Sequence, residues 1–199
     1  MLEVFLFVNP IGMRCREAES AVIQLSEETD IRIDLHFVLL LNFQVIDQYM
    51  QRLGLDPLDL ALRNRLFDAA YQIALDYQAA QYQGNSKART LLMAEQEMFT
   101  DGCYDYDPAF AEACVKGYGL NWEIFQDDRH AATAGFTADQ NIAQEMGVEQ
   151  TPCAVLFDTT NPEAPGVRLG NLGNYERFKR VCERIAHAPQ PAKPLLHVL

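Results

Sequence analysis

The chain has 199 residues, of which 49% are hydrophobic, and its formal net charge is −12. This share of apolar residues is enough for a hydrophobic core and excludes disorder over most of the length. The negative charge argues against binding to nucleic acids or anionic membranes, because both are held by clusters of Lys and Arg. The composition therefore predicts a folded protein that binds neither.

No run of about 18 apolar residues is present, and the first residues lack the basic start and small-residue cleavage site of a signal peptide. We therefore expect a cytoplasmic protein. The cysteines are widely spaced and include no C-x-x-C pair, so they indicate neither a disulfide framework nor a zinc site. We expect no cofactor and no metal ion, and mostly reduced, structural thiols. The five cysteines are Cys15, Cys103, Cys114, Cys153 and Cys182.

The start of the chain predicts a β-α-β unit. Residues Leu2 to Val8 form a short run of branched and aromatic side chains, typical of a buried strand, which Pro10 ends. From Met13 onward, apolar residues recur at helical spacing. Residues Ile31 to Leu41 predict a second strand. Because a helix connects the two strands, we expect them to be parallel and the crossover to be right-handed.

The middle of the chain, from Asn42 to Met146, carries helical patterns and no strand signal. In the longest helix, Pro57 stands where proline is tolerated at the first helical position, and Gly84 is placed to end the helix. We expect the shorter helices to pack on it as a helical subdomain. The predicted helices are Phe43–Leu53, Pro57–Gln83, Ser86–Phe99, Pro108–Tyr118, Asn121–His130 and Thr137–Met146.

Strand patterns return after Gly147. Residues Cys153 to Phe157 and Gly166 to Leu169 are short apolar runs separated by a loop with prolines, so they predict an antiparallel hairpin. A helix should follow from Asn174, a good capping residue, to Ala186. The tail from Pro189 is rich in proline and is not expected to be helical.

Two short motifs lie next to predicted strands. The first is FVNPIGMRC, Phe7 to Cys15, and the second is VEQTP, Val148 to Pro152, directly before the third predicted strand. With these motifs the chain resembles the DsbA-like branch of the thioredoxin superfamily over most of its length. The resemblance implies an α/β, thioredoxin-like fold with a large all-helical insertion. The implied parts are a discontinuous thioredoxin-like domain over residues 1–41 and 147–187, a helical insertion subdomain over 42–146 and a Pro-rich C-terminal tail over 188–199.

The first motif departs from the pattern of DsbA-like proteins, which have a C-x-x-C pair after Asp-Pro. Here Gly12 occupies the position of the first cysteine, Asn9 stands in place of Asp, and only Cys15 remains of the pair. The resemblance also implies that Pro152 is cis, which would leave the backbone of Thr151 free to pair with an extended peptide by strand addition. The binding residues implied by the resemblance are Asn9, Pro10, Gly12, Met13, Arg14, Thr151 and Pro152.

Disulfide exchange requires an exposed thiolate that attacks and a second thiol that resolves the mixed disulfide. Gly12 removes the attacking thiol, and Cys15 corresponds to the less exposed cysteine of the pair. We therefore expect no efficient disulfide oxidoreductase activity. Cys15 is the residual redox candidate, either alone as a sensor or bridged to Cys153, its candidate redox partner. The alternative is that Cys153 faces the core as a small apolar group.

Three segments resemble a narrower subgroup, namely the opening motif, HFVLLLNFQ (His36 to Gln44) and NSKAR (Asn85 to Arg89). This subgroup is related to the adaptor SpxH, or YjbH, which presents the redox regulator Spx to the protease ClpXP, and its members are often labelled dithiol-disulfide isomerases. The resemblance implies a protein-binding adaptor whose partners are an Spx-like regulator and a Clp protease component. Two alternatives stay open, a thiol-disulfide isomerase or oxidoreductase and a glutathione-dependent transferase or isomerase. The sequence does not fix the oligomeric state.

Overall fold

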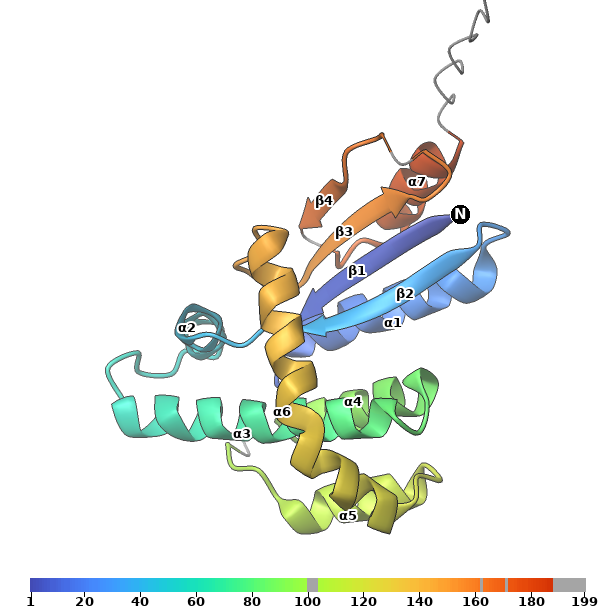
Figure 1. Cartoon of the computed structure of the whole chain (residues 1–199). Helices are drawn as coiled ribbons and strands as arrows, with labels where there is room; N and C mark the ends of the chain where they lie inside the picture. The colour runs from blue at the N-terminus through green and yellow to red at the C-terminus, as the bar shows by residue number, and fades with distance from the viewer. Residues whose placement is uncertain (100–103, 162, 171, 188–199) are drawn as a thin grey trace, which may run out of the picture.

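The computed structural model describes residues 1–99, 104–161, 163–170 and 172–187. Its centre is a four-stranded mixed sheet in the order β2-β1-β3-β4 (Figure 1). The strands are β1 (Leu2–Val8), β2 (Ile33–Leu39), β3 (Cys153–Asp158) and β4 (Val167–Gly170). The helices of the described residues are α1 (Met13–Glu28), α2 (Phe43–Arg52), α3 (Leu60–Gln81), α4 (Asn85–Met98), α5 (Pro108–Gly117), α6 (Trp122–Glu145) and α7 (Tyr175–Ala186).

The strand directions agree with the sequence analysis. β1 and β2 are parallel, with Leu2 opposite Ile33 and Val8 opposite Leu39, as expected for strands joined through a helix. β3 runs antiparallel to β1 and to β4, which confirms the predicted hairpin. With the long run of helices between β2 and β3, the fold is the predicted α/β arrangement.

The sheet is covered on both faces, because successive side chains of each strand point to opposite sides. On one face, Val4 and Leu6 of β1 belong to a buried cluster with residues of α1 and α7. On the other face, Phe7 packs with Val155 of β3 and with Ala143 near the end of α6. The central strand β1 is therefore buried on both sides, which explains its almost continuous apolar sequence.

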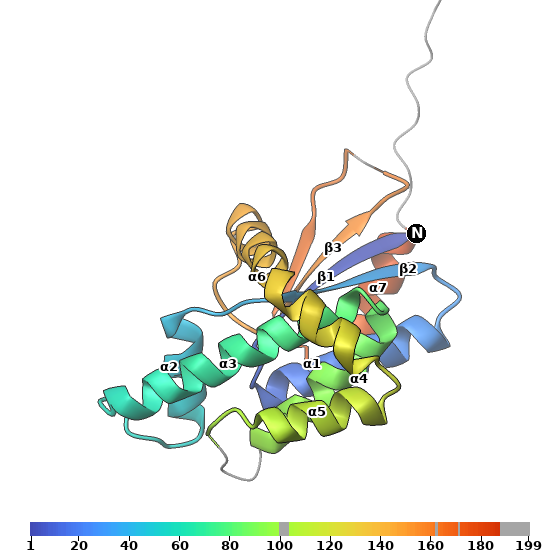
Figure 2. The same ribbon diagram turned by 60° about the horizontal axis from the view of Figure 1, so that its bottom comes forward.

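Helices α3, α4 and α5 pack beside one another beyond the carboxyl ends of β1 and β2 (Figure 2). The second half of α3, from Ala69 to Ala80, is almost completely buried, and its buried polar side chains, Asp76 and Gln78, are paired with residues of α6. The helix begins at Leu60, not at Pro57 as predicted. The reason is a side-chain cap, since Asp59 accepts a hydrogen bond from the Leu62 N–H at 2.9 Å.

Helix α6 is one continuous helix, so the prediction of two helices separated by residues 131–136 was wrong. The helix runs through Gly135, where a Cβ atom would lie 2.4 Å from Gln78 Oε1 of α3. The glycine thus permits close packing of α6 on α3 and does not end a helix. Polar contacts hold both halves of α6 on α3: Arg129 forms an ion pair with Asp76, and Gln78 donates to Asp139 at 2.7 Å.

Two polar side chains of α6 also close the free edge of β2, which is an outer strand of the sheet. Asp139 accepts a hydrogen bond from the Leu39 N–H at 2.9 Å. Gln140 donates to the Leu39 carbonyl at 2.6 Å and accepts from the Leu41 N–H at 3.3 Å. Burial raises the pKa of Asp139 to about 7, against the lowering effect of the Leu39 and Gln78 donors.

The apolar core runs without interruption from the α1 face of the sheet into α3 and α4. The division of the chain into a thioredoxin-like domain and a helical subdomain stays a prediction. Cys103 and the tail from Pro189 lie outside the described residues. None of the described helices combines the length and the apolar character needed to cross a membrane.

Gly135→Ala should destabilise the protein, although alanine favours helices over glycine by about 1 kcal/mol. The methyl group would overlap the buried Gln78 amide, which its hydrogen bond to Asp139 holds in place. Overpacking of this kind costs roughly 1–3 kcal/mol. We expect the free energy of unfolding, measured by urea denaturation, to fall by about 1 kcal/mol. Gly117→Ala in α5, where a Cβ meets nothing within 4 Å, is the matched control and should be neutral or stabilising; equal losses would contradict the packing argument.

Asp139→Asn should flatten the pH dependence of stability. Because the folded-state pKa of Asp139 is raised to about 7, the native state binds its proton more tightly than the unfolded chain does. The stabilisation from this carboxyl group is complete below about pH 4 and is lost as the pH rises through about 7. Between about pH 5 and pH 8.5, the wild type should lose roughly 2 kcal/mol more than the variant, whose amide oxygen accepts the same two hydrogen bonds. Urea denaturation across this range measures the difference. The control Glu145→Gln changes an exposed residue near the end of the same helix and should keep the wild-type dependence of the unfolding free energy on pH. If Asp139→Asn keeps that dependence too, Asp139 is not its source.

Candidate functional site

The loop between β1 and α1 is built around Asn9. The Asn9 Oδ1 accepts a hydrogen bond from the Ile11 N–H at 3.1 Å, and the Asn9 carbonyl accepts one from the Gly12 N–H at 3.2 Å. Asparagine commonly supports such a turn through its side chain. Asn9, Pro10 and Ile11 are all buried. The turn is therefore a fixed part of the core that sets the direction of α1.

Gly12 directly precedes α1, at the position of the missing attacking cysteine. It has no side chain to cap the helix. A Cβ atom on Gly12 would lie 3.2 Å from Cys15 Sγ and 3.3 Å from Asn9 Cβ. A cysteine or serine would fit only if one of these buried neighbours moved, so the glycine is part of the local packing.

Cys15 faces the core from the first turn of α1, and only 1% of its surface is exposed. Its sulfur accepts a hydrogen bond from the Asn9 N–H at 3.1 Å. Burial raises the pKa of the thiol to about 12, and the lowering effects of the Asn9 amide and the Thr151 hydroxyl do not offset it. Cys15 is thus a neutral thiol at physiological pH, and a neutral thiol is a poor nucleophile.

A buried carboxyl group lies one helical turn after Cys15. Glu19 is fully buried, and Gln96 of α4 donates to its Oε1 at 2.8 Å and to the Asn9 carbonyl at 3.3 Å. Burial raises the pKa of Glu19 to about 8, with Gln96 acting in the opposite direction. The sequence analysis missed both residues. For Glu19 the signal was present, because it stands on the apolar stripe of α1.

The loop before β3 brings the second motif to the first. The Thr151–Pro152 peptide bond is cis, the isomer that the resemblance implies. Thr151 is 5% exposed, and its hydroxyl faces the Cys15 thiol. Thr151 lies outside the strands, and within the described part of the chain its amide and carbonyl make no backbone hydrogen bond. They are therefore available to pair with an extended peptide.

The structure does not bring Cys153 to Cys15. Cys153 pairs with Phe7 across the sheet and packs on the face that α6 covers, whereas Cys15 packs on the α1 face. Both cysteines are free. Burial raises the pKa of the Cys153 thiol. The candidate bridge between them is not formed in this structure, because the two side chains pack on opposite faces of the sheet. Cys153 packs as a small apolar residue, the alternative that the sequence analysis named.

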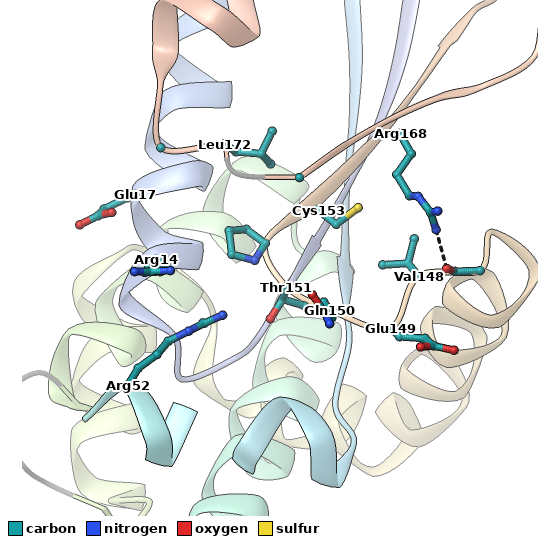
Figure 3. A pocket seen from close by; sticks show the side chains of 14 residues that line it. Arg14, Glu17, Arg52, Val148, Glu149, Gln150, Thr151, Cys153, Arg168 and Leu172 are labelled. Carbon is teal, nitrogen blue, oxygen red and sulfur yellow. Dashed lines mark hydrogen bonds between the residues drawn. The ribbon is translucent and has the colours of Figure 1, made fainter. Parts of the chain in front are cut away.

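A groove of about 830 Å³ runs along the cis-proline loop (Figure 3). The first turns of α1, the end of α2, residues 147–153, strand β4 and residues 172–173 form its walls. The charged residues of the lining are Arg14, Glu17, Arg52, Glu149 and Arg168.

The residues expected for binding divide into two sets. Arg14, Thr151 and Pro152 line the groove. The others do not line it, because most of them form the turn that supports α1. Asn9, Pro10 and Gly12 are buried and Met13 is exposed. Arg52 and Arg168, which the sequence analysis missed, join the lining from α2 and β4.

One group of side chains on the sheet offers metal-ligand atoms within 4.8 Å of one another: Glu3, Asp34 and His36. His36 Nε2 lies 3.2 Å from Glu3 Oε1 and 3.6 Å from Asp34 Oδ2. Exposed acidic groups commonly gather in this way without a metal ion. The group lies on β1 and β2 and is not part of the groove lining.

The described geometry therefore supports binding better than catalysis. The groove offers an unpaired backbone and several charged side chains, while the position of the attacking thiol is occupied by Gly12. The remaining thiol of the motif, Cys15, is buried and neutral. A thiol-disulfide cycle has no exposed thiolate in this part of the chain with which to begin.

Known proteins with similar sequences include adaptors. The chain is 23% identical over 186 residues to the ClpXP adapter protein SpxH of Staphylococcus saprophyticus, an alignment that covers 92% of this chain and 66% of that protein. With SpxH of Staphylococcus aureus it is 23% identical over 190 residues, covering 94% of this chain and 67% of that protein. The chain thus spans about two thirds of the length of these relatives.

Solved structures with the same fold include thiol-disulfide proteins. The cytosolic disulfide reductase DsbM of Pseudomonas aeruginosa has a TM-score of 0.63 at 14% identity, covering 91% of this chain and 97% of that chain. BdbD of Bacillus subtilis has a TM-score of 0.65 at 12% identity, covering 93% and 87%. At these identities the likeness shows the fold alone. A family model described as thioredoxin matches residues 5–180, and the chain therefore belongs to this thioredoxin family.

Proposed function

We propose that the protein is a binding adaptor that holds a partner protein at the groove beside Pro152, with little or no disulfide oxidoreductase activity. One observation carries the proposal: the cis-proline loop holds the Thr151 backbone, which no described residue pairs with, beside α1, while the attacking position is Gly12. The thiol that remains, Cys15, has a pKa of about 12. The site thus retains the parts that hold a polypeptide and lacks the part that would exchange disulfides with it.

The relatives support the same function. Proteins named ClpXP adapter protein SpxH align with more than nine tenths of the chain. On this basis we propose that the partner belongs to the Clp system, and more specifically that the chain presents an Spx-like regulator to a Clp protease in the cytoplasm.

The enzymatic alternatives require a group that the site lacks. A thiol-disulfide isomerase needs an exposed thiolate at the start of α1, and a glutathione-dependent transferase related to the kappa class would use a serine there to activate the glutathione sulfur. Either side chain at position 12 would begin 3.2 Å from Cys15 Sγ. No observation at the groove favours one of these reactions.

Filling the groove should abolish partner binding without unfolding the protein. Gly173 lines the groove, and a Cβ there meets no atom within 4 Å, so Gly173→Trp places a bulky side chain in open space. Gly117→Trp is the matched control, because its Cβ position in α5 is equally open and lies outside the groove. We expect the affinity for the host's purified Spx-like regulator, measured by calorimetry, to fall at least about tenfold in Gly173→Trp only. Circular dichroism should show both variants folded.

The same proteins allow a functional readout. Wild-type protein should accelerate degradation of the regulator by ClpXP, and Gly173→Trp should not. If the wild type binds neither the regulator nor ClpX, and instead reduces insulin disulfides with a turnover that disappears in Cys15→Ser, the adaptor proposal fails and the enzymatic alternative takes its place.

Cys15 should resist alkylation in the native protein. With a pKa of about 12, fewer than about one Cys15 thiol in a thousand is ionised near pH 7.5, and the side chain is covered. Cys114, on α5, is only partly buried. We expect iodoacetamide to modify Cys114 at least about ten times faster than Cys15, as followed by peptide mass spectrometry. Both should react fully in urea; comparable native rates would show that Cys15 is a reactive thiol.

A further inference from the structure

The groove carries an unusual charge for this protein. Acidic residues outnumber basic ones by 12 over the whole chain, yet the lining contains three arginines and only two glutamates. The arginines come from three separate elements: Arg14 from α1, Arg52 from the end of α2 and Arg168 from β4. Their gathering around one groove of an acidic protein indicates an anionic occupant.

The charges of two of these arginines are not neutralised by a described acidic residue. Neither Arg14 nor Arg52 forms an ion pair with any described residue. Arg52 lowers the pKa of Cys15 by its charge, so it lies close to the meeting point of the two motifs. Arg168 donates to the Gly147 carbonyl at 2.8 Å, which uses one of its several N–H groups.

The arginines flank the unpaired backbone. In Figure 3, Arg14 and Arg52 lie to one side of Thr151, and Arg168 lies to the other. A peptide that adds a strand at Thr151 would therefore run from one arginine group toward the other. Side chains of an extended strand alternate between its two faces, so acidic residues on either side of the paired residue could each reach a guanidinium group.

The positive charge continues to the start of α1. The first turn of this helix contains no acidic residue and includes Arg14. The glycine before the helix cannot cap the amides of Met13 and Arg14, which make no hydrogen bond to another described residue. The positive end of the helix dipole thus adds to the attraction of the arginines for carboxylates.

We propose that the groove binds an extended, acidic segment of the partner protein, with its backbone paired to Thr151 and its carboxylates held by Arg14 and Arg52 on one side and Arg168 on the other. The inference rests on the proposed adaptor function and names the chemistry of the segment that this adaptor recognises. Glu17 and Glu149 in the same lining would repel an acidic segment, but the three arginines outnumber these two glutamates.

The test uses fluorescence anisotropy with two labelled ten-residue peptides, one alternating Glu with Val and the other alternating Gln with Val. At low salt, about 50 mM, the 199-residue chain should bind the Glu peptide at least about tenfold more tightly than the Gln peptide. Raising the salt to about 300 mM should remove most of this difference, because exposed charges are screened.

Variants identify the groups responsible. The double substitution Arg14→Gln and Arg52→Gln should bring the affinity for the Glu peptide down to that for the Gln peptide. The control is Arg32→Gln with Arg184→Gln, two exposed arginines outside the groove lining, which changes the net charge equally. It should keep most of the preference.

The outcomes separate this inference from the adaptor function. The inference is overturned if the wild type does not bind the Glu peptide, if both peptides bind equally, or if both double variants weaken binding alike. The adaptor function still stands in these cases if Gly173→Trp abolishes binding of the regulator. Displacement of the Glu peptide by micromolar glutathione would also overturn the inference, since it would assign the arginines to a small thiol peptide. If the Glu peptide binds as expected and no Clp-system protein does, the groove chemistry stands and the adaptor function falls.

Discussion

The fold depends on the way in which α6 closes the edge of β2. Asp139 and Gln140 take the place of a neighbouring strand for the backbone of Leu39 and Leu41. An outer strand with unpaired amides and carbonyls would invite pairing with another chain. The same helix is held on α3 through Gln78, which donates to Asp139. One buried carboxyl group therefore links β2 of the sheet to both α6 and α3.

The candidate site is supported by a connected set of buried side chains, and its one remaining thiol is buried. Asn9, Cys15 and Glu19 form a connected buried set with Gln96, which ties the turn before α1 to α4. In a thiol enzyme such groups would tune an exposed thiolate. Here burial keeps Cys15 and Glu19 protonated near neutral pH. The set now serves to hold the amino end of α1 against the cis-proline loop, which is the geometry that a polypeptide ligand needs.

The sequence predicted what depends on local pattern. The strands, the direction of their pairing and most helices follow from apolar periodicity and turn residues, and the two motifs identified the place of the site. The sequence could not reveal contacts between residues far apart. The prediction of two helices in place of α6 is an example, because the packing of Gly135 on Gln78 joins residues of two different helices. In the same way, Arg52 and Arg168 belong to segments whose meeting at the groove depends on the tertiary fold.

The tight packing around Gly12 bears on how such a protein could change over time. Its neighbours have closed in, with Cys15 Sγ and Asn9 Cβ both within 3.3 Å of where a Cβ would stand. A cysteine or serine at this position would require one of these buried neighbours to move. It would therefore disturb the buried turn that sets the direction of α1. The packing at Gly12 thus favours keeping the glycine, which agrees with the proposed role in binding a polypeptide.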